Sequence, residues 1–272
     1  MYRVMRAVFK AFIPSNTKII RNAYIPSGKP TIYAATHVIY NDVPIFLAHL
    51  PQHAYLLLAI ESYENSPSRL EHFVLWLYGV IIVRRDNKES RKTAFEKMVR
   101  VIKNNGSILL FPEGLINFSP NMLIQPINWG AVKLASATGA NLVPAAINET
   151  ETTHQIIIDE PFNYTDYTDL QQATTGLRDV MATLIYELIK MTTQINRTEV
   201  TDEMWLSHIH KQYKHRKVFD QGLEETFLYR PKGETNLSEV LADLYGISHA
   251  SFAADYSQYK RIQKLIEKWN RI

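Results

Sequence analysis

The sequence predicts an α/β fold, with a mainly parallel central sheet flanked by helices. Short apolar runs rich in Ile, Leu, Val and Ala alternate with longer stretches of helical periodicity, roughly to residue 195. The runs are apolar at consecutive positions, which is typical of parallel strands buried on both faces. The chain has 272 residues, of which 46% are apolar, so it is long enough to enclose a substantial core.

The predicted strands are spaced so that a helix fits between one and the next. They are "TIYAAT" (31–36), "AYLLLAI" (54–60), "GVIIVRR" (79–85), "SILLF" (107–111) and "NLVPAAI" (141–147), with "HQIIID" (154–159) as a candidate sixth. Helical patterns lie at 42–50, 68–78, 88–105, 129–140 and 169–194. Gly106 is expected to end the helix at 88–105. In such sheets, sites form at the carboxyl ends of strands, so polar residues there are the candidates for chemistry.

The two ends of the chain differ in pattern from the middle. Residues 1–30 are expected to form an amphipathic N-terminal helix and a lead-in, residues 31–195 the α/β domain, and residues 196–272 a helical C-terminal extension. On the N-terminal helix, basic and apolar residues fall on opposite sides: Arg3, Arg6 and Lys10 against Met5, Val8, Phe9 and Phe12. Such a helix either lies in a membrane interface or packs on the protein's own core, and the pattern favours neither.

Composition excludes several classes of protein. Without Cys, the chain has no disulfide scaffold, no thiolate nucleophile and no Cys-based zinc site. A net charge of +3 is too small to indicate nucleic-acid binding, but it suits an anionic membrane surface. The longest apolar run, residues 73–83, is shorter than the roughly 20 residues of a spanning helix. We therefore expect neither a transmembrane segment nor a nucleic-acid partner.

Three histidine–aspartate pairs share one spacing: His37 with Asp42, His154 with Asp159, and His215 with Asp220. His154 and Asp159 bracket a predicted strand, where side chains five residues apart point to opposite faces. His215 lies among lysines and arginines, which is typical of a solvated basic face. His37 instead follows a buried strand, and Asp42 begins the next helix. A turn can bring this imidazole and carboxylate together, and an oriented imidazole is a better general base.

Other strand ends carry further candidate residues. Glu113 and Gly114 follow a predicted strand in "FPEG", and Arg84 and Arg85 end "GVIIVRR". Pro144 lies inside "NLVPAAI", which is unusual for a central strand. Taken singly, each has a plain structural reading as a turn carboxylate, a surface arginine pair or an edge-strand proline.

Together, these segments resemble the four sequence blocks of the glycerolipid acyltransferase superfamily. "HVIYND", "GVIIVRR", "FPEG" and "LVPAAI" occur in the order and approximate spacing of those blocks, over roughly residues 30–150. The superfamily includes glycerol-3-phosphate and lysophosphatidate acyltransferases. The histidine–aspartate spacing alone is weak, as its three occurrences show, whereas all four blocks in order are specific.

The resemblance implies an acyl transfer in which the enzyme is not itself acylated. His37 is expected to take a proton from an acceptor hydroxyl and Asp42 to orient the imidazole, while the hydroxyl oxygen attacks an acyl thioester. The implied donor is acyl-CoA or acyl carrier protein, and the implied acceptor is a lysophospholipid such as 1-acylglycerol 3-phosphate. No metal or other cofactor is implied, and a lipid substrate implies a peripheral position on the cytoplasmic face of the membrane.

The same resemblance assigns the remaining blocks to binding. The residues implied at the acceptor site are Gly79, Arg84, Arg85, Glu113 and Gly114. The resemblance implies a structural role near the acyl-chain site for Val143 and Pro144.

The sequence departs from the family pattern at two places. Leu115 and Ile116 stand where members acting on phosphate-bearing acceptors often have Thr-Arg, whose arginine meets the phosphate. Thr36 stands where Asn or Ser is common, and it keeps a hydroxyl. The alternatives are therefore an acyltransferase acting on a glycolipid or a cell-wall glycerol polymer, a thioesterase that transfers to water, and a non-catalytic lipid-binding relative.

Overall fold

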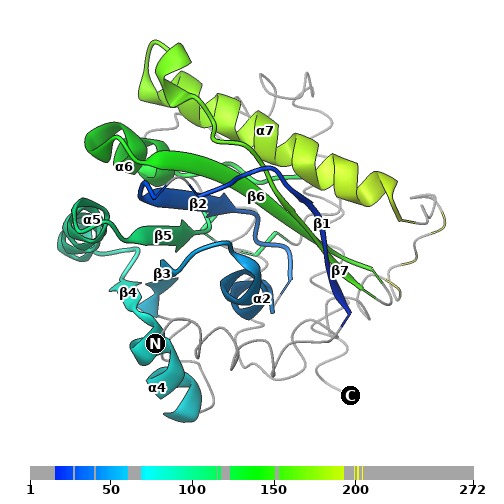
Figure 1. Ribbon diagram of the computed structural model, residues 1–272, viewed down its shortest axis with the longest axis horizontal. Helices are drawn as coiled ribbons and strands as arrows, with labels where there is room; N and C mark the ends of the chain where they lie inside the picture. The colour runs from blue at the N-terminus through cyan, green and yellow to red at the C-terminus, as the bar shows by residue number, and fades with distance from the viewer. Residues whose placement is uncertain are drawn as a thin grey trace.

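The computed structural model describes most of the chain between residues 16 and 192, and Figure 1 shows how the elements are arranged. The described residues are 16–26, 28–39, 41–60, 69–114, 116–117, 123–150, 153–192, 199, 201 and 204. The predicted N-terminal helix, Leu115, the pair His215 and Asp220, and nearly all of the predicted C-terminal extension lie outside these residues.

A seven-stranded sheet forms the centre of the protein, in the order β1-β7-β6-β2-β5-β3-β4 (Figure 1). Its strands are β1 (Thr17–Asn22), β2 (Thr31–Ala35), β3 (Ala54–Ala59), β4 (Val80–Val83), β5 (Ser107–Leu110), β6 (Asn141–Glu149) and β7 (His154–Ile158). Every neighbouring pair is parallel except β6 with β7. The predicted α/β class with a mainly parallel sheet is confirmed, as is the candidate sixth strand.

Helices cover both faces of the sheet. They are α2 (Asp42–His49), α4 (Arg69–Tyr78), α5 (Lys88–Lys103), α6 (Gly130–Thr138) and α7 (Leu170–Lys190), with a short 3₁₀ turn, η1 (Tyr164–Asp166). One core lies between the sheet and α5, α6 and α7, and the other lies between the sheet and α2 and α4. Among the helices that the structure describes, none has both the length and the apolarity to cross a bilayer.

The middle strand β2 shows why an apolar run without alternation becomes a strand here. All of its residues are buried. Ile32 and Ala34 belong to the core under α5, α6 and α7, whereas Tyr33 and Ala35 belong to the core under α2 and α4. Consecutive side chains of a strand point to opposite faces, so a strand with helices on both sides is buried at every position.

The edge strand β1 lies within the expected lead-in and is not predicted from the sequence. It pairs in parallel with β7, and most of its residues are exposed, so it carries no continuous apolar run. Arg21 ties it to the rest of the fold, because Nη2 lies 3.3 Å from Oδ1 of Asp159 and Nη1 lies 2.7 Å from Oε2 of Glu187 on α7. The sheet therefore begins before residue 31, where the α/β domain was expected to start.

Pro144 lies in an interior strand rather than an edge strand, because β6 pairs with both β2 and β7. Its carbonyl accepts a hydrogen bond from the N–H of Asp159 at 3.0 Å, one residue past Ile158, the last residue of β7. In a strand, the nitrogen of a residue points to the same side as its carbonyl. The N–H group that proline lacks would therefore face the end of β7, where the β6–β7 pairing stops, and the sheet tolerates a proline there.

The C-terminal end of α5 is made by a different residue from the expected one. Asn105, not Gly106, takes the left-handed conformation, with a φ of 61°. The N–H of Gly106 donates to the carbonyl of Val101 at 2.9 Å, and the N–H of Asn105 donates to that of Ile102 at 2.9 Å. These two bonds form a Schellman motif with asparagine at the position that glycine usually takes. Asparagine tolerates this conformation better than most residues with a Cβ atom.

Candidate active site

The register of two neighbouring strands brings the first candidate residues together. β2 and β5 are parallel, with Ala34 opposite Leu110. Three residues further along each strand direction stand His37 and Glu113, and the N–H of His37 donates to Oε1 of Glu113 at 3.0 Å. The carboxyl ends of two buried strands thus meet at one point, as expected for a site in a parallel sheet.

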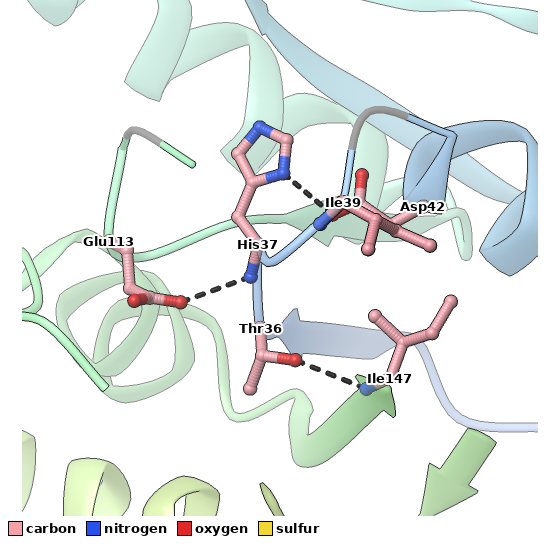
Figure 2. Close-up of polar contacts among 6 residues, drawn as sticks. All are labelled: Thr36, His37, Ile39, Asp42, Glu113 and Ile147. Carbon is pink, nitrogen blue, oxygen red and sulfur yellow. Dashed lines mark hydrogen bonds and ion pairs between the residues drawn. The ribbon is translucent and has the colours of Figure 1, made fainter. Parts of the chain in front are cut away.

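The imidazole of His37 is bonded to Asp42, as the turn between strand and helix predicts. Nδ1 of His37 lies 2.7 Å from Oδ2 of Asp42 (Figure 2). Asp42 is the first residue of α2 and is fully buried. A carboxylate is favoured at a helix N-terminus, where the unpaired N–H groups point. The same oxygen accepts the N–H of Ile39 at 3.5 Å, which fixes the turn around the carboxylate.

This contact determines what the imidazole can do. A carboxylate accepts hydrogen bonds, so Asp42 selects the tautomer with the proton on Nδ1 and leaves the lone pair of Nε2 to accept a proton. Nε2 points away from both Asp42 and Glu113 in Figure 2. The ring of Phe111 packs against the imidazole, with 4.5 Å between ring centres, and 19% of the His37 side chain is exposed. The arrangement suits a general base that a substrate hydroxyl can reach.

Thr36 fixes the residue before His37. Its own N–H donates to the carbonyl of Ala145 at 3.1 Å, and its Oγ1 accepts the N–H of Ile147 at 3.1 Å (Figure 2). The side chain is fully buried. The hydroxyl thus takes over hydrogen bonding to β6 at the point where β2 ends.

Glu113 is fully buried, and both of its oxygens accept backbone N–H groups. Oε1 takes that of His37, and Oε2 takes that of Gln125 at 3.0 Å. Burial raises the pKa of Glu113 from 4.5 to about 7, because a charged carboxylate loses its hydration. The two hydrogen bonds and the nearby charges of His37 and Arg178 act in the opposite direction. Contact between Glu113 and an acceptor stays a prediction.

Arg85, at the end of the segment "GVIIVRR", contacts the loop that holds Glu113, although β3 lies between β4 and β5 in the sheet. Nη1 of Arg85 donates to the carbonyl of Gly114 at 2.7 Å. Arg84 is exposed, and its N–H donates to Oγ of Ser90 at 2.9 Å. Gly79 stands in the turn before β4 and has a φ of 100°. Arg85 and Gly114 are thus brought together, whereas Gly79 has a local reason to be glycine, since a Cβ atom there would lie 2.5 Å from the ring of Tyr55.

The fourth block lies next to β2 in the sheet. Val143 stands opposite Tyr33, and Pro144 stands opposite Ala34. Both Val143 and Tyr33 are fully buried in the core on the α2 side. A role for Val143 and Pro144 near an acyl chain stays a prediction.

The other described histidine–aspartate pair is not joined. Nε2 of His154 lies 3.5 Å from Oε1 of Glu149 on the neighbouring strand, and Asp159 pairs with Arg21. Equal spacing in the sequence therefore leads to different contacts, because β7 is extended between the two residues whereas a turn joins His37 to Asp42.

Sequence reasoning missed two residues that contact this site. The N–H of Asn117 donates to the carbonyl of His37 at 2.6 Å, and Nε2 of Gln125 donates to Oδ1 of Asn117 at 3.3 Å. Neither residue belongs to a pattern of strand or helix periodicity. The one available signal was a glutamine inside an apolar stretch, "LIQPINW", and Gln125 is indeed fully buried. Across the part of the chain that the structure describes, no cluster of three or more His, Asp and Glu side chains has the arrangement of a metal site.

Comparison with known proteins agrees with this geometry. Residues 16–148 match the family model described as Acyltransferase. The 1-acyl-sn-glycerol-3-phosphate acyltransferase of Borreliella burgdorferi is 28% identical over 126 residues, which are 46% of this chain and 48% of that protein. The chain therefore spans about half the length of this curated relative.

A solved structure is similar over a larger share of the chain. The 1-acyl-sn-glycerophosphate acyltransferase PlsC of Thermotoga maritima aligns with a TM-score of 0.57 and 16% identity. The alignment covers 71% of this chain and 81% of that one. At this identity the likeness concerns the fold.

Proposed function

Because this chain belongs to the glycerolipid acyltransferase superfamily, we propose that it is an O-acyltransferase that moves a fatty acyl chain from a thioester to a lipid hydroxyl. The observation that carries the proposal is the bond between His37 and Asp42 at the end of β2. It leaves one imidazole nitrogen available to a hydroxyl, in a chain that has no cysteine to act as a nucleophile.

The reaction needs one base that later returns its proton. Nε2 of His37 takes the proton of the acceptor hydroxyl as its oxygen attacks the thioester carbonyl carbon. The carbonyl π electrons move to oxygen, and when they return the carbon–sulfur bond breaks. The imidazolium then gives its proton to the leaving thiolate, so atoms and charges balance. Asp42 holds the ring in place and stabilises its charged form between the two steps.

For the acceptor, we propose a lysophospholipid such as 1-acylglycerol 3-phosphate. Support comes from the name of the Borreliella burgdorferi relative and from Arg85, a cation bonded to the loop beside His37. We further propose acyl-CoA or acyl carrier protein as the donor. The basic amphipathic pattern of residues 3–12 supports a peripheral position on the cytoplasmic face of the membrane, near the lipid substrate.

A second acceptor class is favoured by Ile116. This residue precedes Asn117, whose N–H donates to the carbonyl of His37, so an apolar side chain stands at the loop that contacts the candidate base. Of the guanidinium groups at this loop, that of Arg85 already binds the carbonyl of Gly114, and that of Arg178 is buried and binds the carbonyl of Ile124 at 3.1 Å. An acceptor without phosphate, such as a glycolipid or a glycerol polymer, needs no cation at this position.

A panel of donors and acceptors tests the proposal. The protein is incubated with long-chain acyl-CoA or acyl carrier protein, and with lysophosphatidate, glycerol 3-phosphate, monoacylglycerol or a glycolipid, and the products are identified by mass. Acylated lysophosphatidate supports the first acceptor, and acylation of neutral acceptors alone supports the second. Free fatty acid as the sole product indicates a thioesterase. No turnover of any donor indicates a non-catalytic relative and contradicts the proposal.

A further inference from the structure

The candidate base His37 and three residues near it, Glu113, Asn117 and Gln125, are joined in a closed ring of hydrogen bonds. The N–H groups of His37 and Gln125 each donate to one oxygen of Glu113, both at 3.0 Å. Nε2 of Gln125 donates to Oδ1 of Asn117 at 3.3 Å, and the N–H of Asn117 donates back to the carbonyl of His37 at 2.6 Å. Figure 2 shows the first of these bonds. Both backbone polar groups of His37 are therefore held by residues of the segment 113–125.

The ring acts where the sheet no longer holds the chain. β2 ends at Ala35, and Thr36 still donates to the carbonyl of Ala145 on β6. At His37 the backbone instead bonds to Glu113 and Asn117. Since backbone N–H and C=O groups away from water need partners, these two residues determine where the chain lies as it leaves the strand. The orientation of the imidazole follows from that placement, together with its bond to Asp42.

Two side chains of the ring are fully buried, and both oxygens of Glu113 face a matching N–H donor. Glu113 and Gln125 are fully buried, where a polar group is costly unless it is hydrogen-bonded. A carboxylate accepts with both oxygens, as Glu113 does here, whereas an amide in its place would present an NH₂ group to one of the two N–H donors. Asn117 also donates from Nδ2 to the carbonyl of Leu123 at 3.2 Å, so its amide joins the two ends of the loop.

We propose that Asn117 and Gln125, together with Glu113, are positioning residues. Through this ring they fix the backbone of His37, and so the direction from which Nε2 meets the acceptor hydroxyl. The inference rests on the proposed function, in which His37 is the base. It gives Glu113 an action through the backbone of His37 rather than through contact with the acceptor.

Three substitutions open the ring at different points. Asn117→Ala removes the acceptor of Gln125 and keeps the backbone bond to His37. Gln125→Met removes the donor at similar volume, and Glu113→Gln sets an NH₂ group against a backbone N–H. Asn117→Asp keeps the Oδ1 acceptor of the ring and loses only the Nδ2 bond to the carbonyl of Leu123, so it separates the two bonds of this side chain. Asn128→Ala is the matched control, because Nδ2 of Asn128 donates to the carbonyl of Pro112 at 3.0 Å in the same loop but outside the ring.

The measurements are kcat, the KM for the acceptor, thermal unfolding, and the rate at which diethyl pyrocarbonate modifies His37, followed by peptide mass. We expect kcat to fall about 10-fold or more in each ring variant, with acceptor KM changed less than about 3-fold, because misplaced reacting groups slow the chemical step. We expect Asn117→Asp, which keeps the ring bond, to retain more of kcat than Asn117→Ala, and we expect Asn128→Ala to stay close to the unmodified protein. The double variant Asn117→Ala/Gln125→Met falls no further than either single one, because the ring is opened only once. The rate of His37 modification changes in the ring variants alone.

Several results would overturn the inference. A raised acceptor KM at unchanged kcat in Glu113→Gln places that carboxylate at the acceptor. Unchanged kcat in folded Asn117→Ala, or an equal loss in Asn128→Ala, removes the positioning role. If Gln125→Met does not fold, Asn117→Ala with Asn117→Asp carries the test. His37→Ala in the same assay separates the two proposals: if it remains active, His37 is not the base and the proposed mechanism fails, and if it is inactive while Asn117→Ala is active only the ring inference fails.

Discussion

Thr36 and Ile147 are joined across the end of β2, where Oγ1 of the threonine accepts the buried N–H of the isoleucine at 3.1 Å. The hydroxyl replaces the backbone carbonyl of Thr36, which would accept this N–H if the ladder between β2 and β6 continued. It therefore links the strand that leads into His37 to β6.

Thr36→Val tests that link. Valine has nearly the same shape but leaves the N–H of Ile147 without its acceptor, and a buried unpaired donor costs about 1–3 kcal/mol. We expect the free energy of unfolding in urea to fall by that amount. Thr36→Ser, which keeps the hydroxyl, should lose well under half as much. Equal losses in the two variants would show that the methyl group matters rather than the hydrogen bond.

Gly79 tests how closely the turn before β4 packs against Tyr55. Its φ of 100° disfavours any residue with a Cβ atom, and that atom would lie 2.5 Å from the ring of Tyr55. We expect Gly79→Ala to lower the free energy of unfolding by about 3 kcal/mol or more. Gly139→Ala is the matched control, with a φ of 69° and nothing within 4 Å, and should cost about 1 kcal/mol. Equal costs would mean that Tyr55 does not constrain this turn.

The buried carboxyl of Glu113 predicts a pH dependence of stability. Its folded pKa of about 7 lies above the ordinary value of 4.5, so its stabilising contribution is complete below pH 4.5 and is lost as pH rises through about 7. The shift corresponds to about 3 kcal/mol. Relative to the unmodified protein, Glu113→Gln should therefore gain up to about 3 kcal/mol in unfolding free energy between pH 4.5 and about pH 8. A difference that does not vary with pH would show that the carboxyl titrates normally.

Ile116 predicts a change of acceptor preference. We expect Ile116→Arg to raise kcat/KM for lysophosphatidate about 10-fold relative to a neutral acceptor, because a guanidinium forms charge-assisted bonds to phosphate. Ile116→Gln, which adds length without charge, is the control. The gain should shrink as salt concentration rises. A gain for neutral acceptors alone would contradict a phosphate-binding role for this position.

The parts of the fold that the sequence predicts are those with a local signature. The helix expected at 88–105 is observed at Lys88–Lys103, and the strand expected at 79–85 is observed at Val80–Val83. The edge strand β1 escapes prediction because its partner β7 lies more than a hundred residues away and its own residues are mostly exposed. No local pattern records such a pairing.

The candidate site also has residues that the sequence predicts and residues that it does not. The sequence places His37 and Glu113 at strand ends and Asp42 at the start of the next helix, and strand register explains why His37 and Glu113 meet. The N–H of Asn117 donates to the carbonyl of His37 and the N–H of Gln125 donates to Glu113, and any residue except proline carries such a group. These backbone bonds leave no trace in residue type, so apart from a glutamine inside an apolar stretch the ring becomes visible only in three dimensions.

The central claim, that His37 held by Asp42 is the base for acyl transfer, is tested most directly by the transfer rate of two variants. With donor and acceptor saturating, kcat of folded His37→Ala and Asp42→Asn should fall by about 10²–10⁴-fold, the contribution of a positioned general base. Added imidazole should restore part of the rate to His37→Ala but none to Asp42→Asn. If both folded variants transferred acyl chains at the unmodified rate, His37 would not be the base, and the proposed mechanism would be wrong.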